Sequence, residues 1–156
     1  MIIGITGYNA SGKDTVAGYL EKKGFTHYSL SDIIRDELKK KKKKLTRENL
    51  INEGNKLREE CGPSILAKKT IEKITENNHI ITSIRNEQEV LALKQLNNYI
   101  LIKVISPIEQ RFKRLTKRNR IGDPKTIAEL KEKESLEEST NMNNQQLHLA
   151  AKLAEV

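Results

Sequence analysis

Apolar and polar residues follow two alternating periods along this chain. Residues 1–6 form an apolar run that is too short for a helix and is typical of a strand buried on both faces. Residues 12–23 then follow a helical pattern. Further strands are predicted at 27–30, 79–84 and 99–105, and further helices from 31 onward and at 46–61, 63–76, 87–96, 107–118, 124–138 and 145–154.

Two of these helices carry recognisable start signals. Ser31 and Asp32 supply N-cap chemistry directly after the second strand. Ser106 is followed by a proline at the first helical position and by Glu109, which is placed to close a capping box. We therefore expect helices to begin at these two points.

Strands that alternate with helices predict an α/β fold with three layers, in which helices cover both faces of a parallel sheet of four to five strands. With 156 residues, the chain is most economically one domain, spanning 1–156. Ligands of such sheets bind at the carboxyl ends of the strands. We therefore look for function in residues 7–15, 31–35, 82–86 and 106–120.

The segment after the first strand has the strongest chemical signal. It reads GYNASGK from Gly7 to Lys13, with the spacing G-x-x-x-x-G-K, and a helix follows. Glycines at this spacing let backbone N–H groups turn toward phosphate oxygens, and the lysine reaches the terminal phosphates. The alternative is a βα turn without a ligand. We expect ATP to be bound by Gly7, Asn9, Ala10, Ser11, Gly12, Lys13, Asp14 and Thr15.

The residue after the lysine departs from the common pattern. A serine or threonine hydroxyl normally ligates Mg²⁺ there, whereas this chain has Asp14, followed by Thr15. A carboxylate is also a hard oxygen ligand, so Asp14 is the candidate metal residue. The alternative, which does not exclude the first, is that Asp14 complements the positive helix end. The third strand ends in Thr82-Ser83 and so offers no carboxylate to hold Mg²⁺ there. Asp14 or Asp32 would have to take that role.

The net charge of +8 raises the question of nucleic-acid binding. Much of the excess is the run from Lys39 to Lys44, and such runs are usually solvated. Aromatic residues make up 4% of the chain and tryptophan is absent, so stacking platforms are few. We do not expect direct nucleic-acid binding, and the role of the lysine run is open.

Other partners and sites receive little support from composition. No apolar run approaches the roughly 20 residues that span a bilayer, and the first residues lead straight into the glycine loop, so we expect neither a membrane segment nor a signal peptide. The single Cys61 fits a reducing cytoplasm. No histidine has zinc-ligand spacing. The sequence leaves open whether the protein forms a homo-oligomer.

Residues 7–15 resemble the P-loop of nucleoside-monophosphate kinases and of their dephospho-coenzyme A kinase relatives, some of which carry aspartate after the lysine. The run from Ser31 to Arg35 resembles the G-D-x-x-R segment of adenylate kinases, with Ser31 in place of the glycine. Residues 110–120 resemble the arginine-rich entry to their lid. Small archaeal adenylate-kinase-like or dephospho-coenzyme A kinase-like proteins are closer, because their third strand ends in an I-R-x-x-x-E-V run, here 84–90.

The resemblance implies a P-loop NTPase fold with an acceptor-binding helical insert at about 31–76 and a lid at about 111–138. It implies an ATP-dependent, Mg²⁺-requiring phosphotransferase whose acceptor is a nucleoside monophosphate or a related nucleotide. Phosphoryl transfer needs positioning and cationic stabilisation, which suits the arginines of this chain. The implied catalytic residues are Lys13, Arg114, Arg118 and Arg120. The implied acceptor residues are Asp32, Arg35 and Arg85.

Two other function classes are kept open. The missing third-strand carboxylate, and a chain that stops at Val156 where related kinases continue, favour a nucleotide-binding regulatory module without phosphotransfer. Either Val156 begins a fifth strand that is cut short, or the protein recognises the base of its nucleotide less fully than related kinases do. Charge alone favours a basic nucleic-acid binder. The sequence does not identify the acceptor.

Overall fold

The four strands form one parallel sheet in the order β2-β3-β1-β4. This computed structural model describes residues 1–75, 77–119, 122–136 and 146–156. The strands are β1 (Ile2–Thr6), β2 (Thr26–Ser29), β3 (His79–Thr82) and β4 (Tyr99–Lys103). All five residues of the central strand β1 are buried, as expected of a strand covered on both faces.

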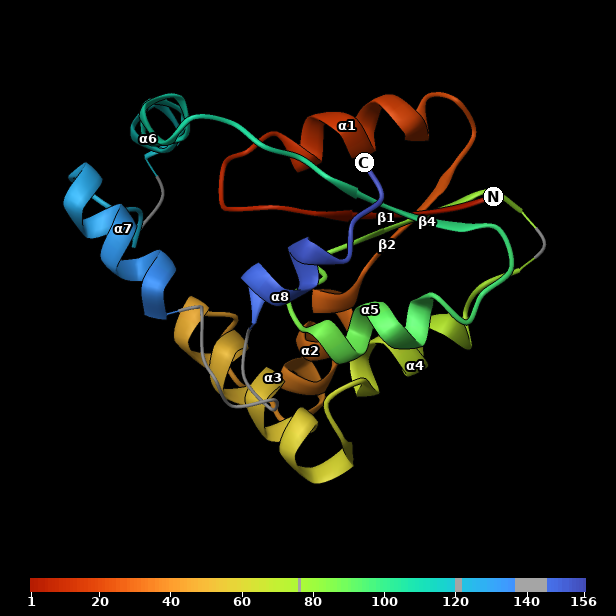
Figure 1. Cartoon of the computed structure of the whole chain (residues 1–156). Coiled ribbons are helices and arrows are strands. Elements are labelled where there is room, and N and C mark those ends of the chain that lie inside the picture. The colour runs from red at the N-terminus through yellow and green to blue at the C-terminus, as the bar shows by residue number, and fades with distance from the viewer. Residues whose placement is uncertain (76, 120–121, 137–145) are drawn as a thin grey trace.

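Helices cover both faces of the sheet (Figure 1). Helix α1 (Lys13–Glu21) lies on one face. The other face carries α2 (Leu30–Lys40), α4 (Ile65–Ile71), α5 (Glu87–Leu93) and α8 (Leu147–Lys152), with α3 (Arg47–Cys61) packed against α2 and α4. Helices α6 (Ile108–Arg118) and α7 (Ile127–Leu136) follow β4 and contact each other.

The hydrophobic core is split by the sheet. Ile3 and Ile5 of β1 pack with Ala17 beneath α1, whereas Ile2 belongs to the larger cluster on the opposite face, with Leu101. This alternation follows from the two-residue period of a strand. The predicted α/β fold with a parallel sheet and helices in layers is therefore confirmed.

The final residues run along the outer edge of β4. The Glu155 N–H donates to the Leu101 carbonyl at 3.0 Å, and the Val156 carbonyl accepts from the Lys103 N–H at 2.6 Å. These two hydrogen bonds join residues 155–156 to β4, although the described sheet has four strands and these residues form no further one.

Both predicted helix starts are wrong by one or two residues. Helix α2 begins at Leu30 with Ser29 as its N-cap, so Ser31 lies in the first turn, where its hydroxyl is 2.8 Å from that of Ser29. The N-cap of α6 is Pro107, and the Ser106 hydroxyl donates to Gln110 at 3.4 Å. In both cases the serine hydroxyl has a side-chain partner instead of a helix N–H, which a local motif does not reveal.

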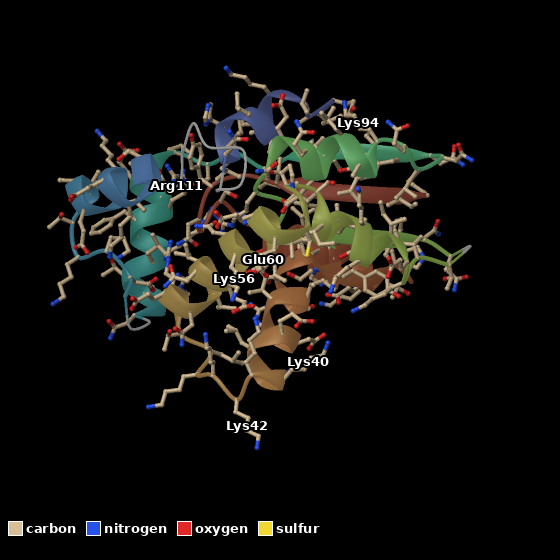
Figure 2. All side chains as sticks on the ribbon, turned by 90° about the horizontal axis from the view of Figure 1, so that it is seen from below. Lys40, Lys42, Lys56, Glu60, Lys94 and Arg111 are labelled. Carbon is tan, nitrogen blue, oxygen red and sulfur yellow. The ribbon has the colours of Figure 1, made fainter. Side chains whose placement is uncertain are left out.

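The lysine run lies at the end of α2 and in the turn that follows, where Lys40 and Lys42 project outward (Figure 2). Lys40 pairs with Glu37 at 2.9 Å, and Lys41 pairs with the buried Glu53. Lys40 and Lys41 therefore stabilise the end of α2 and the turn that follows it through ion pairs. Within the described residues, none of the helices is both long and apolar enough to cross a membrane.

Candidate functional site

The glycine loop between β1 and α1 has the backbone conformation that its sequence predicts. Gly7 has φ 136°, and a Cβ there would lie 2.3 Å from the Val104 carbonyl oxygen beyond β4. Gly12 has φ 111° and is the N-cap of α1. Only glycine adopts these conformations without strain. The loop is therefore held against the carboxyl end of β4, at the positive end of α1.

Two polar side chains of the loop are oriented by it. The Lys13 amino group donates to the carbonyls of Gly7 and Tyr8, at 2.6 Å each, so it folds back over the loop. The Ser11 hydroxyl is buried and has no partner among the described residues. Buried polar groups are normally hydrogen-bonded, so an orphaned hydroxyl in a glycine loop fits a missing anionic ligand.

Asp14 and Thr15 lie in the first turn of α1 and are exposed to solvent. Both offer hard oxygen donors beside the loop. No group of three or more histidine, cysteine or acidic side chains gathers as a metal site within the part of the chain that the structure describes. A cation bound here would therefore also need oxygen atoms from a bound small molecule or from water to complete its coordination.

Arginines of α6 reach back to the glycine loop. Arg114 Nη1 donates to the carbonyls of Ala10 and Ser11 at 2.9 and 3.1 Å. The buried Arg111 pairs with Glu134 of α7, and its guanidinium carbon lies 5.1 Å from the centre of the Tyr8 ring. These contacts join the loop to α6 and α7. Arg120 lies outside the described residues.

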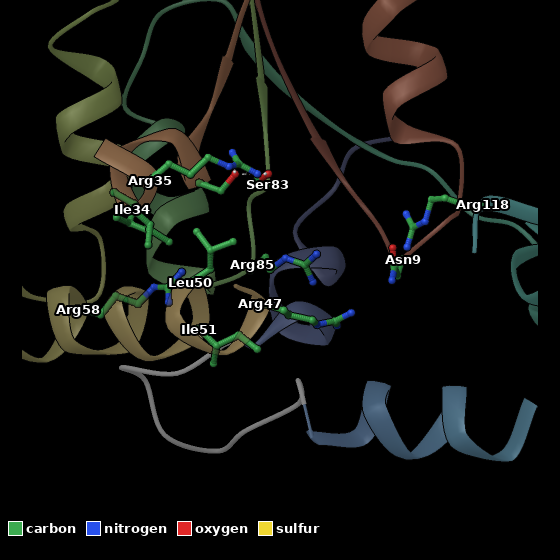
Figure 3. Close-up of a pocket in the computed structure, with 12 residues that line it drawn as sticks. Asn9, Ile34, Arg35, Arg47, Leu50, Ile51, Arg58, Ser83, Arg85 and Arg118 are labelled. Atoms are coloured by element: carbon green, nitrogen blue, oxygen red, sulfur yellow. Dashed lines mark hydrogen bonds between the residues drawn. The ribbon is translucent and has the colours of Figure 1, made fainter. Parts of the chain in front are cut away.

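A cavity of about 310 Å³ opens beside the loop and extends over α2 and α3 (Figure 3). Arg35 and Arg85 both line it, as does Arg118, which also pairs with Asp123 at 3.1 Å. Asp32 is absent from the wall but accepts from Arg35 at 2.7 Å. Among the described residues, the cavity is lined by Asn9, Ser31, Ile34, Arg35, Arg47, Leu50, Ile51, Arg58, Leu66, Ser83, Arg85 and Arg118.

Two lining arginines, Arg47 and Arg58, were missed by the sequence reasoning. Both lie on α3, on the same face as Leu50 and Ile51. A helical-wheel projection would have placed them together, because positions 47, 51, 54 and 58 recur at helical spacing. The pattern does not say, however, that this face of α3 borders a cavity instead of the core.

The carboxylate of Glu89 anchors the wall of this cavity. It is fully buried, and its Oε1 accepts from Arg58 Nε and Nη2 at 3.0 and 2.8 Å. Its Oε2 accepts from the backbone N–H groups of Arg85 and Asn86 at 2.9 and 3.1 Å, within the capping box of α5. One carboxylate thus fixes both the connection between β3 and α5 and the Arg58 guanidinium. The N-x-x-E spacing at 86–89 was a signal for the cap, although not for the arginine.

The end of β3 carries hydroxyl groups and no carboxylate at 82–83. Thr82 Oγ1 lies 2.8 Å from His27 Nε2, and Ser83 Oγ lies 2.8 Å from Ser29 Oγ. Ser83 has φ 61°, which ends the strand two residues earlier than predicted. Asp32, one of the two residues that could replace a carboxylate here, accepts from Arg35 at 2.7 Å instead of lining the cavity.

Comparison with known proteins places this arrangement in a family. The AAA domain model AAA_18 matches residues 3–137. The UPF0200 protein of Thermococcus kodakarensis is 34% identical over 142 residues, which cover 86% of this chain and 77% of that one. The UPF0200 protein of Methanothermobacter thermautotrophicus is 34% identical over 141 residues, covering 88% and 72%.

Solved structures agree on the fold. The crystal structure of TT1252 from Thermus thermophilus matches with a TM-score of 0.58 at 23% identity, covering 87% of this chain and 79% of that one. A chain of the Pnkp1/Rnl/Hen1 RNA repair complex matches with a TM-score of 0.58 at 15% identity, covering 97% and 45%. At these identities the likeness concerns architecture alone. From the matched domain and the relatives, this chain belongs to the UPF0200 proteins and carries an AAA domain.

Proposed function

We propose that this protein transfers a phosphoryl group from ATP, with Mg²⁺, to a nucleoside monophosphate or a closely related nucleotide. One observation carries the proposal: the cavity lined by Arg35, Arg85 and Arg118 also contains Asn9 of the glycine loop. An acceptor phosphate held there lies next to the loop that would hold the terminal phosphate of ATP. Catalysis of phosphoryl transfer depends mainly on this kind of positioning and on cationic stabilisation.

On the donor side, the backbone of residues 7–15 would hold the phosphates. The Lys13 amino group would exchange its bonds with the Gly7 and Tyr8 carbonyls for phosphate oxygens. Ser11 would gain the partner that its buried hydroxyl lacks. Arg114 lies against this loop, and Arg118 lines the cavity, so they are the proposed cationic groups around the transferred phosphoryl, together with Arg120.

Asp14 and Thr15 are the proposed protein ligands of Mg²⁺, directly or through water. Their carboxylate and hydroxyl oxygens suit a hard cation, and phosphate oxygens would complete its coordination. Bound there, Mg²⁺ would neutralise charge on the phosphates.

Asp14→Asn is expected to raise the Mg²⁺ concentration needed for half-maximal phosphotransfer, because an amide oxygen is a weaker ligand than a carboxylate. We expect a rise of about tenfold, in line with one lost charge-assisted contact. A Mg²⁺ titration of ATP binding and of turnover measures it. Asp36→Asn, which removes an exposed charge on α2, is the matched control. An unchanged requirement would mean that Asp14 acts only on the helix end.

Arg35→Ala and Arg85→Ala are each expected to weaken acceptor binding by about tenfold or more while ATP binding is kept. A guanidinium–phosphate contact is a charge-assisted hydrogen bond, for which roughly 1.5–3 kcal/mol is typical. KM values for acceptor and for ATP separate the two effects. Both variants should be measured at low and high salt beside Lys42→Ala, because a merely long-range charge effect fades with screening. Unaltered acceptor affinity in both variants would contradict this assignment.

A nucleotide-binding regulatory module is the second candidate, favoured by the hydroxyl groups of Thr82 and Ser83 where a metal-binding carboxylate is common. Such a module would bind ATP without transferring phosphate. The deciding experiment is a phosphotransfer screen with ATP and Mg²⁺ against nucleoside monophosphates, deoxynucleotides and dephospho-coenzyme A. Formation of a phosphorylated acceptor supports the kinase. ATP binding without any phosphorylated product supports the module.

A further inference from the structure

The acceptor cavity has two chemically different ends. Asn9 and Arg118 lie at one end, beside the glycine loop, whereas Arg58 lies at the other with Ile34, Leu50 and Ile51 (Figure 3). If the phosphate of the acceptor faces the glycine loop, its base reaches the second end. The apolar side chains there offer a surface for a flat ring, and Arg58 adds a polar group to it.

Arg58 is held rigidly at this end. Its side chain is 4% exposed, and two of its nitrogens are committed to Glu89. The third, Nη1, makes no hydrogen bond within the described residues and lies 3.4 Å from the position that a Cβ on Gly54 would take. The same Cβ would lie 2.9 Å from Ile34, so the lack of a side chain at Gly54 makes room for Ile34, beside which the guanidinium lies.

This end of the cavity offers hydrogen-bond donors and few acceptors. A guanidinium has donors only. Each oxygen of Glu89, the carboxylate behind it, already accepts two N–H groups. A carbonyl oxygen on a base would therefore find a charged donor in Arg58. An exocyclic amino group at the same place is itself a donor, and it would meet the guanidinium donors without finding an acceptor.

Resting on the proposed function, we propose that the acceptor is a nucleotide with a keto base, such as guanine, hypoxanthine or uracil, and that Arg58 determines this preference. Guanidinium groups favour keto oxygens in the same way when they read guanine in nucleic acids. Glu89 acts as a positioning residue, because it reaches the base only through Arg58.

Two matched pairs of probes test this inference. IMP differs from AMP, and UMP from CMP, in a keto group that replaces an amino group on the ring and in the adjacent ring nitrogen, which carries a proton in IMP and UMP. With saturating ATP and Mg²⁺, we expect kcat/KM to be about tenfold or more higher for IMP than for AMP, and for UMP than for CMP, because one charge-assisted contact distinguishes them.

Arg58→Lys is the informative variant. Lysine keeps a positive charge beside Glu89, but a single ammonium group does not reproduce the planar fork that serves Glu89 and the base together. In Arg58→Lys we expect the ratio of kcat/KM between the keto and the amino nucleotide of each pair to fall by about tenfold, through a change in KM. Arg35→Ala, in contrast, should lower kcat/KM equally for both members of a pair. Where Arg58→Lys does not fold, the comparison of the probe pairs on the unaltered protein decides.

The inference and the proposed function fail in different ways. Phosphorylation of AMP and CMP as fast as of IMP and UMP overturns the inference and leaves the kinase intact. If no monophosphate is phosphorylated, the dissociation constants of IMP and AMP, measured by titration calorimetry, decide whether the pocket prefers a keto base. Binding of IMP about tenfold tighter than AMP supports the keto-base pocket without the kinase, and equal binding or no binding overturns it.

Discussion

Lys13→Ala is expected to lower phosphotransfer from ATP by about two to three orders of magnitude, the typical effect of removing one preorganised donor from a transition state. In the cradle formed by residues 7–13, backbone N–H groups shape the pocket, and Lys13 brings a full positive charge. Its flexible side chain is able to follow the charge that develops on the transferred group. Turnover assays and titration calorimetry with ATP measure the loss.

The fold should survive this substitution. Lys13 is the first residue of α1, where alanine is well tolerated, and its two bonds to loop carbonyls are not part of the core. Circular dichroism and thermal unfolding check this. Lys22→Ala, which removes an exposed lysine just beyond the same helix, is the matched control and should keep full activity. Equal ATP affinity and turnover in Lys13→Ala would refute the phosphate-binding role of the loop.

Arg58→Met is expected to have the largest effect on stability, a loss of about 3–5 kcal/mol in the free energy of unfolding. Arg58 and Glu89 form an ion pair with side chains 4% and 0% exposed. Methionine keeps much of the arginine volume, so the main cost comes from a buried Glu89 charge that has lost its partner. For a chain of this length, the melting temperature should fall by about 10 °C. Urea unfolding, with the midpoint and slope compared, measures the change.

The double variant Arg58→Met with Glu89→Gln separates the pair from packing. Glutamine keeps an oxygen for the N–H groups of Arg85 and Asn86 while it removes the buried charge. We expect most of the lost stability to return, because exchanging both members of a buried pair is often close to neutral. A double variant as unstable as the single one would attribute the effect to shape, and a fully stable single variant would show that the pair contributes little.

Local sequence was sufficient for the features that depend on backbone geometry. The G-x-x-x-x-G-K spacing requires positive φ values at Gly7 and Gly12, and the structure has them at 136° and 111°. The apolar runs predicted β1, β3 and β4, since strands buried on both faces have few polar residues. The polar strand β2 does not follow from such a run. The positions of Arg35 and Arg85 near one site followed from a rule about the carboxyl ends of parallel strands.

Sequence by itself therefore determined the glycine loop, the sheet and the two arginines at the ends of its strands, because each depends on interactions within a short stretch or on a general rule of chain topology. Tertiary structure alone decided that α3 borders the cavity, which brings Arg47 and Arg58, near the two ends of that helix, to the site. It also decided that Glu89 meets Arg58, 31 residues away, instead of serving only as a helix cap. Such contacts depend on how separate helices pack, and side-chain period within one helix does not encode the neighbour that its faces will meet.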